Sequence, residues 1–313
     1  MSAITIEAPA KLNLHLKVGN RRPDGFHDIE SLFLALAFGD TLHFETTPLE
    51  TAAPPEIRMN WQLSGENIIS RAVSLFRERT GFNQGLNVTV EKRIPPGGGL
   101  GGGSSNAAAA LLALNRLAAD NGLLSGAELA EIAALLGSDV PFFLHNTTAA
   151  WVTGRGEQIQ PLELPESLMN LAFVLVNPGF PSDTAEAYRL LDDIRLSQNF
   201  TTEYAEFLIR KPSFLRETPW LNNSSPREWP FFNDFLPVLS NSDKGSFYQR
   251  IMGELRELGA EFAGLSGSGS TCFGVFSGQS QAESARDNLR ERWPFVIFSF
   301  LLARRTIPCY SSK

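Results

Sequence analysis

A cluster of glycines in the middle of the chain limits how this sequence can fold. Six of the seven residues from Gly97 to Gly103 are glycine, and Leu100 is the exception. Ordering a glycine costs roughly 0.5–1 kcal/mol more backbone entropy than ordering another residue. An ordered cluster therefore costs a large part of a net stability of about 5–15 kcal/mol. We expect the segment to serve a function that side chains would obstruct.

The flanking residues predict a strand before the cluster and a helix after it. Residues 86–92 alternate apolar and polar side chains, and the two prolines that follow end the strand because proline lacks a ladder donor. An alanine-rich helix, capped by Ser104 or Ser105, runs to residues 121–122. Backbone N–H groups and the positive helix end make such a loop a polyphosphate site. The predicted phosphate-binding residues are Pro95, Pro96, Gly97, Gly98, Gly99, Leu100, Gly101, Gly102, Gly103, Ser104 and Ser105.

Three other kinds of glycine-rich segment fit the sequence less well. A Walker A loop requires Lys followed by Ser or Thr after the last glycine, and that pair does not occur there. The spacing G-x-G-x-x-G matches the dinucleotide fingerprint, which needs a second strand about 20 residues later. The sequence instead predicts a helix from a Ser125–Glu128 capping box to Gly137. A flexible linker would be polar on both sides, whereas these glycines stand between a predicted strand and an alanine-rich helix.

The composition of the 313-residue chain is that of an ordinary globular protein, with 43% hydrophobic and 19% charged residues, and its length indicates about two domains. The formal net charge of −7 argues against a nucleic-acid partner. Cys272 and Cys309 form no CxxC pair, so neither a disulfide framework nor a zinc site is expected. We also expect a cytoplasmic protein without a membrane partner, because the sequence has neither a signal-peptide pattern nor a long apolar run.

Strands and helices are mixed without strict alternation, which predicts an α+β fold. Residues 11–18 form a predicted two-faced strand. Its apolar face holds Leu12, Leu14, Leu16 and Val18, and its polar face holds Lys11, Asn13, His15 and Lys17. Further strands are predicted at 32–38, 42–45, 148–153, 171–176, 271–276 and 295–303, helices at 67–80, 184–194, 247–258 and 280–292, and a loop at 48–55. Residues 196–242 show no clean period.

Three motifs together resemble the GHMP small-molecule kinases: Pro9–Leu14, Pro95–Asn106 and Leu265–Ser270. The segments Arg22–His27 and Leu136–Phe142 resemble the branch of this superfamily that acts on 4-diphosphocytidyl-2-C-methyl-D-erythritol.

The resemblance implies a two-domain fold and a reaction. An N-terminal ribosomal protein S5 domain 2-like unit would span residues 1–160, and a C-terminal ferredoxin-like α/β sandwich would span residues 161–313. The implied reaction is transfer of the γ-phosphoryl group of ATP, with Mg²⁺, to the substrate 2-hydroxyl in the non-mevalonate (methylerythritol phosphate) route to isoprenoid precursors. The implied protein is a monomer or homodimer, with no protein metal ligand assigned. Phosphoryl transfer needs alignment and positive charge more than covalent help.

The same resemblance assigns roles to five residues. Asp139 accepts the proton of the substrate hydroxyl, and Lys11 beside it keeps the carboxylate ionised. His27 hydrogen-bonds the cytosine, Phe26 stacks on it, and Asn13 contacts the substrate. The family more often has tyrosine at position 26, and stacking survives that change. Without the resemblance, Asp139 fits a helix cap, Lys11 a solvated strand residue and His27 a surface turn.

Several alternatives remain open from the sequence. The turn at 266–270 either approaches phosphate or is only structural. Another GHMP kinase, acting on mevalonate-, homoserine- or sugar-type substrates, would use the same ATP loop but would give Phe26 and His27 no base to bind. A catalytically silent nucleotide-binding sensor is disfavoured by the presence of both Lys11 and Asp139.

Overall fold

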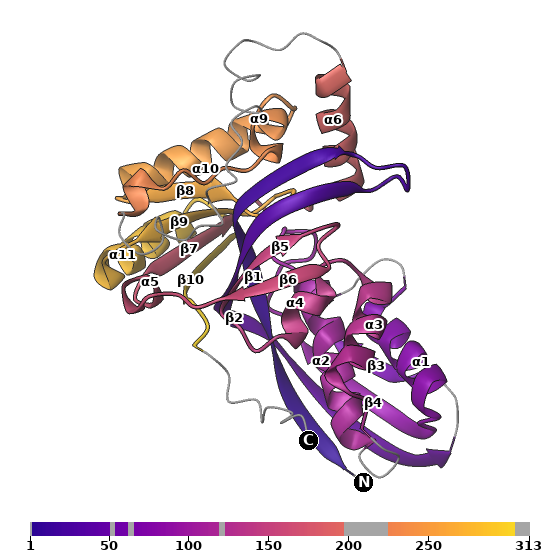
Figure 1. Cartoon of the computed structure of the whole chain (residues 1–313). Coiled ribbons are helices and arrows are strands. Elements are labelled where there is room, and N and C mark those ends of the chain that lie inside the picture. The colour runs from indigo at the N-terminus through magenta and orange to yellow at the C-terminus, as the bar shows by residue number, and fades with distance from the viewer. Residues whose placement is uncertain (1, 51–53, 62–65, 119–122, 197–224, 304–313) are drawn as a thin grey trace.

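The computed structural model describes residues 2–50, 54–61, 66–118, 123–196 and 225–303, and the fold contains two β-sheets. The first has the strand order β3-β4-β2-β5-β6, with β1 paired to β2 (Figure 1). Its strands are β1 (Ala3–Arg21), β2 (His27–Glu50), β3 (Glu56–Met59), β4 (Gln84–Glu91), β5 (Ala149–Thr153) and β6 (Gln158–Leu162). The strands predicted at 32–38 and 42–45 are parts of β2, which also includes the first residues of the predicted loop at 48–55.

Four helices accompany the first sheet: α1 (Ile68–Thr80), α2 (Gly102–Leu117), α3 (Gly126–Leu136) and α4 (Val140–Leu144). As predicted, α1 ends at Gly81, which adopts a left-handed backbone, and the Ser125–Glu128 capping box opens α3. The predicted cap of α2 at Ser104 or Ser105 is wrong. The cap is Gly101, three residues before Ser104, because this glycine, with φ of 68°, turns the chain directly into the helix without a side-chain cap. The predicted end of this helix at 121–122 lies outside the described residues.

The second sheet has the order β10-β7-β9-β8 and is antiparallel throughout. Numbered along the chain this order is 4-1-3-2, which a ferredoxin-like βαββαβ unit produces. The strands are β7 (Ala172–Asn177), β8 (Phe262–Leu265), β9 (Cys272–Phe276) and β10 (Phe295–Phe300). The accompanying helices are α5 (Glu166–Met169), α6 (Thr184–Leu196), η3 (Pro226–Glu228), α9 (Phe235–Ser240), α10 (Gly245–Glu257) and α11 (Gln279–Arg290). The predicted two-domain α+β fold is confirmed.

The division predicted between residues 160 and 161 falls inside β6, which pairs with β5 up to Leu162. Backbone contacts also join the two sheets, since Leu36 of β2 bridges to Leu301 just after β10. The free Cys272 is buried, and Cys309 lies outside the described residues.

Strands β1 and β2 form a long ribbon whose turn lies beside α6 (Figure 1). The predicted alternation of β1 is wrong beyond Leu14, because the pairing register shifts between Asn13 and His15. An extra residue at such a bulge moves the following side chains to the opposite face. His15 therefore packs on Trp151 and Phe232, with ring centroids 6.0 and 4.5 Å apart, and does not share a face with Lys11 and Asn13.

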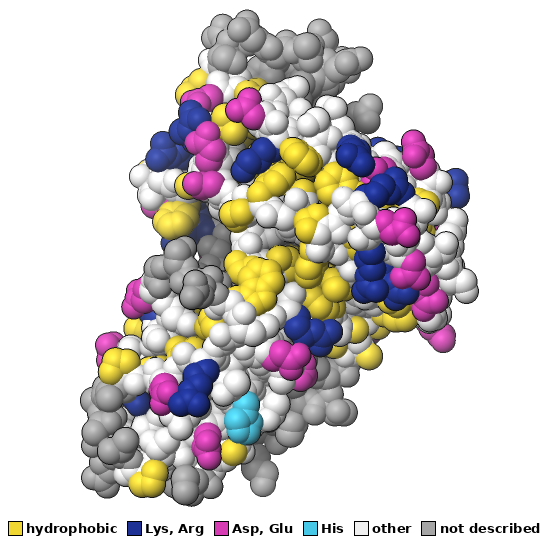
Figure 2. Space-filling view, turned by 180° about the vertical axis from the view of Figure 1, so that it is seen from behind, with side chains coloured by type: hydrophobic (Ala, Val, Ile, Leu, Met, Phe, Trp, Pro, Cys, Tyr) yellow, Lys and Arg dark blue, Asp and Glu magenta, His cyan; other side chains and the backbone are white. Residues whose placement is uncertain are grey.

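Charges of both signs are interspersed over the face shown in Figure 2, and its described residues form no continuous basic patch. Among the described helices, none combines the length and apolar character that crossing a membrane requires.

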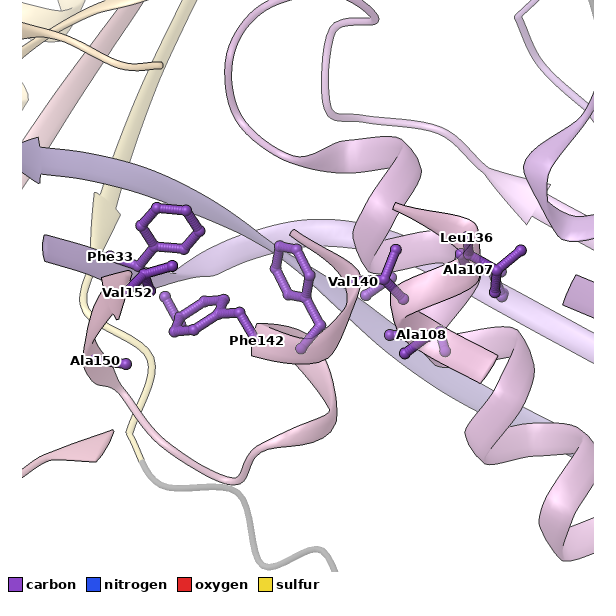
Figure 3. Packing of buried hydrophobic residues seen from close by; sticks show 14 of the residues in the cluster. Phe33, Ala107, Ala108, Leu136, Val140, Phe142, Ala150 and Val152 are labelled. Carbon is purple, nitrogen blue, oxygen red and sulfur yellow. The ribbon is translucent and has the colours of Figure 1, made fainter. Parts of the chain in front are cut away.

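A hydrophobic core lies directly beneath the strands and helices that carry the predicted site. In Figure 3, Phe33 and Val152 of the sheet face Phe142 of α4, and Ala107 and Ala108 of α2 lie near Val140 and Leu136. Phe33 and Phe142 meet edge to face with ring centroids 5.3 Å apart. The alanines of α2 leave room for the helix to lie against β1 and β2. This packing fixes the start of α4 relative to β1.

Candidate active site

A cleft of about 1360 Å³ lies between the glycine loop, the β1–β2 ribbon and α6. All but one of the predicted site residues line it. The lining includes Lys11, Asn13, Phe26, His27, Pro95, Pro96, Gly97, Gly98, Gly99, Leu100, Gly101, Gly102, Gly103, Ser104 and Asp139. The exception, Ser105, is buried in the first turn of α2. The structure thus brings together predicted site residues that are up to about two fifths of the chain apart in sequence.

The backbone of the glycine loop turns its carbonyl groups toward the protein. Every carbonyl oxygen from Gly97 to Gly101 accepts a hydrogen bond within the protein. The donors, in chain order of the acceptors, are Ser182 N, Thr271 N, Ser266 Oγ, Lys11 N and Ser105 N. Among the described residues, the N–H groups from Gly99 to Ser104 have no acceptor. This is the arrangement that an anion site at a helix N-terminus requires.

Most positions in this loop are glycine because a side chain there would collide with neighbouring protein atoms. A Cβ at any glycine from Gly97 to Gly102 would lie 2.2–3.0 Å from a protein atom. At Gly99 that atom is the carbonyl oxygen of Ser266, at 2.2 Å. Only at Gly103, within the described loop, does a Cβ meet open space. At the other five glycines a side chain would therefore collide with the protein itself, and Gly103 is the position where space remains beside the loop.

Lys11 and Asp139 form an ion pair at the floor of the cleft. Lys11 Nζ lies 3.3 Å from Asp139 Oδ2, and the two side chains are 5% and 29% exposed. The ammonium also donates to Asn13 Oδ1 at 2.5 Å and lies 4.6 Å from the centre of the Phe33 ring. Lys11 is therefore not a solvated strand residue. Asp139 precedes α4 but its side chain makes no capping hydrogen bond, so a helix-cap role does not explain it.

Asn13 orients the lysine and connects it to the second sheet. Its side-chain amide donates to Ser31 Oγ at 2.8 Å, and its backbone N–H donates to Ser266 Oγ at 3.2 Å. Ser266 Oγ in turn donates to the carbonyl of Gly99 at 2.9 Å. The turn at 266–270 thus braces the glycine loop, while its Gly267 also lines the cleft.

The other end of the cleft is built from the ribbon turn and α6. His27 Nε2 lies 2.9 Å from Asp192 Oδ1, and the imidazole stacks on Tyr188 with ring centroids 4.8 Å apart. Nε2 is therefore already engaged, and Nδ1 has no partner in the part of the chain that the structure describes. Phe26 is 50% exposed, and the Arg155 guanidinium lies 5.0 Å from the centre of its ring.

Sequence reasoning missed Tyr188, Asp192 and Arg155, which all line the cleft. The helix carrying the first two was predicted, but nothing local shows which of its faces meets the ribbon. Burial, and secondarily the negative charge of Asp139, raises the pKa of Tyr188 to about 12. Its phenol therefore remains a hydrogen-bond donor at neutral pH.

No group of three or more His, Cys, Asp or Glu side chains that could hold a metal ion is found among the described residues.

Two family models match the chain, one in each half. The model for the GHMP kinases N terminal domain matches residues 67–147, and the model for the GHMP kinases C terminal matches residues 243–294. The first match contains the glycine loop and Asp139.

The chain is similar over nearly its whole length to proteins named 4-diphosphocytidyl-2-C-methyl-D-erythritol kinase. The protein from Treponema pallidum (strain Nichols) is 36% identical over 299 residues, which cover 95% of this chain and 98% of the relative. The chain belongs to this family of GHMP kinases. The chloroplastic 4-diphosphocytidyl-2-C-methyl-D-erythritol kinase of Arabidopsis thaliana is 37% identical over 88% of this chain and 68% of its own length.

A solved structure of a 4-(cytidine 5'-diphospho)-2C-methyl-D-erythritol kinase superposes with a TM-score of 0.73 at 31% identity, covering 96% of this chain and all of that one. A homoserine kinase from Cytophaga hutchinsonii superposes with a TM-score of 0.64 at 16% identity, over 96% of this chain and 95% of its own. The second likeness concerns the fold alone.

Proposed function

We propose that this protein transfers the γ-phosphoryl group of ATP to the 2-hydroxyl of 4-diphosphocytidyl-2-C-methyl-D-erythritol, in the non-mevalonate route to isoprenoid precursors. One observation carries the proposal: the Lys11–Asp139 pair lies in the same cleft as a loop of free N–H groups at one end and an aromatic pocket at the other. The family relatives bear the name of this activity.

The glycine loop fits a triphosphate. Its unpaired N–H groups from Gly99 to Ser104 are the donors that phosphate oxygens need, and Gly103 leaves space beside them. We infer that Mg²⁺ enters with the nucleotide, held mainly by phosphate oxygens, and that it neutralises phosphate charge when bound. Asp139 and Ser104, which line the cleft, would supply protein oxygen ligands to the ion.

We assign Asp139 as the acceptor of the hydroxyl proton and Lys11 as the group that holds it in place. Lys11 Nζ lies 3.3 Å from Asp139 Oδ2, so the ammonium fixes the position of the carboxylate. The pair then acts mainly by aligning the hydroxyl, and the proton moves late, when the oxygen has begun to bond to phosphorus. A fixed cation beside the reacting oxygens also stabilises developing negative charge.

The aromatic end fits a pyrimidine. Phe26 offers an exposed ring for stacking, and His27 keeps Nδ1 for a hydrogen bond. Asn13, which accepts from Lys11 Nζ and lines the cleft, is assigned a contact with the substrate. Asp192 and Tyr188 hold the imidazole in one orientation. We further propose that the enzyme works in the cytoplasm as a monomer or homodimer without a nucleic-acid partner, and that its two domains span 1–160 and 161–313.

The test is turnover by the purified full-length chain. ADP release is measured with ATP and Mg²⁺ in the presence of 4-diphosphocytidyl-2-C-methyl-D-erythritol, mevalonate, homoserine or a sugar. We expect turnover with the cytidylyl substrate alone. Turnover with another member of the panel would reassign the chain to a different GHMP kinase activity. Nucleotide binding without turnover of any would favour a sensor.

A further inference from the structure

We propose that Asp40 is a positioning residue that holds the phosphate-binding loop open at a fixed width, an inference that rests on the proposed function. Asp40 lies in β2, is 0% exposed and does not line the cleft. It touches neither the loop's free N–H groups nor the Lys11–Asp139 pair. Its carboxylate nevertheless joins the two chain segments between which the glycine loop is suspended.

The first segment follows directly after β4 and leads into the loop. Asp40 Oδ1 accepts hydrogen bonds from the backbone N–H groups of Arg93 at 2.7 Å and Ile94 at 2.8 Å. These residues come directly before the prolines that lead into the glycines. Pairing two N–H groups with one carboxylate oxygen fixes the direction in which the chain leaves β4.

The second segment is the beginning of α2. Asp40 Oδ2 accepts from Asn106 Nδ2 at 3.0 Å, and Asn106 lies one turn into the helix that follows the glycines. A single buried carboxylate therefore ties the entrance of the loop to its exit. The distance between these two points sets how widely the intervening glycines are spread.

The same oxygen holds a cation at the edge of the cleft. Lys92 Nζ lies 2.5 Å from Asp40 Oδ2, and Lys92 lines the cleft although its side chain is only 5% exposed. Burial lowers the pKa of Lys92, and the charge of Asp40 opposes that shift. The Lys92 ammonium lies 2.9 Å from the point where a Cβ on Gly102 would be. Asp40 thus keeps a positive charge at the first turn of α2.

These contacts predict that Asp40 acts on the nucleotide end only. Without the tie, the loop would have to be ordered when the nucleotide binds, and that ordering opposes binding. The cytidylyl end is attached to the ribbon turn and α6 and has no contact with Asp40. A role in general stability would weaken both ends alike.

The experiment measures binding, not turnover. Asp40→Asn preserves the shape of the side chain and keeps an oxygen that accepts from the N–H groups of Arg93 and Ile94. It replaces the other oxygen with an amide N–H directed toward the Lys92 ammonium. Isothermal titration calorimetry gives Kd for a nonhydrolysable ATP analogue with Mg²⁺ and, separately, for cytidine diphosphate as the probe of the other end. We expect the Kd of the ATP analogue to rise about tenfold or more and the Kd of cytidine diphosphate to stay within about twofold.

The matched control is Glu254→Gln. Glu254 is another carboxylate with little exposure that accepts from Trp293 and Arg250, and it lies outside the cleft lining. It should lower Tm without changing either Kd. If Asp40→Asn does not fold, Asn106→Ala is used instead. This variant removes the hydrogen bond from α2 to Asp40 and leaves the Asp40–Lys92 ion pair in place. We then expect a rise of about threefold in the Kd of the ATP analogue alone.

An unchanged Kd for the ATP analogue in the folded variants overturns the inference, as does an equal rise for both ligands. Failure of the proposed function is recognised separately, since it leaves wild-type turnover absent from the substrate panel while nucleotide binding and its dependence on Asp40 persist.

Discussion

The two ends of the cleft are held in place by different kinds of contact. At the proposed nucleotide end, carbonyl groups of the loop accept hydrogen bonds from β1, from α2 and from turns that adjoin the strands of the second sheet. A buried carboxylate also joins the segments on the two sides of the loop. At the end proposed to bind the cytidylyl group, His27 is held by two side chains of one helix, and Phe26 is half exposed. In the proposed function, the phosphoryl transfer, which tolerates little displacement, therefore takes place beside a backbone held in a fixed position. Recognition of the base depends on side chains that can adjust.

The largest effect should come from Asp139→Asn, which is isosteric and removes only the charge. We expect kcat to fall by about 10²–10⁴, the usual contribution of a general base, with KM for both substrates changed little. Steady-state kinetics with the cytidylyl substrate measures this. Lys11→Met should reduce kcat similarly, and a kcat near the wild-type value in either variant would remove the ion pair from the reaction.

Gly101→Ala should reduce kcat by about 10², because displacement of a catalytic group by an ångström has that consequence. Gly101 has φ of 68°, and its Cβ would lie 2.8 Å from Lys11 Cγ. The control is Gly126→Ala, in the first turn of α3, where a Cβ meets nothing within 4 Å. Equal kcat values for the two variants would show that backbone placement is not what fixes Lys11.

Acidification should weaken the ribbon that joins the two ends. Burial lowers the pKa of His15 from 6.5 to about 3, so between these values the unfolded chain binds a proton that the folded chain does not, and stability falls as the pH drops. Between pH 7 and pH 5 this amounts to about 2 kcal/mol of unfolding free energy.

Urea unfolding at pH 7 and pH 5 tests this prediction in the wild type and in His15→Asn, which keeps an acceptor for the N–H of Phe232. The asparagine variant should lose about 2 kcal/mol less than the wild type between the two pH values. An equal loss in both proteins would mean that His15 takes up its proton without unfolding.

The smallest effect is expected at the cytidylyl end. His27→Ala should raise KM for the cytidylyl substrate by about tenfold, the value of one good hydrogen bond, while kcat and KM for ATP stay near their wild-type values. A fall in kcat with unchanged KM would contradict the contrast between the two ends.

The strand, the glycine loop and the helix that follows it could be predicted from the sequence because their signals are local. The signals are a cluster of glycines, which an ordinary packed segment would not contain, a strand before it and a helix after it. All of them lie within one segment of about 30 residues. The proximity of Lys11 and Asp139 came from the family resemblance, since nothing local relates residues so far apart in the chain.

The features that were missed depend on tertiary packing. The bulge between Asn13 and His15 is set by pairing with β2, so the regular alternation of residues 11–18 gave no sign of it. The helix is capped by Gly101 and not by a serine. Gly101 has a left-handed backbone and packs closely against Lys11, and the sequence around it shows neither feature. Tyr188 was overlooked because the side of α6 that meets the ribbon depends on how the two domains pack.

The β1–β2 ribbon carries Lys11 near its middle and His27 at its turn. With the roles proposed for these two residues, the number of strand residues between them sets the span between the reacting hydroxyl and the base. Lengthening both strands by matched pairs of residues would preserve each side chain's face while moving the base pocket outward, and the chain would then select molecules with a longer spacer.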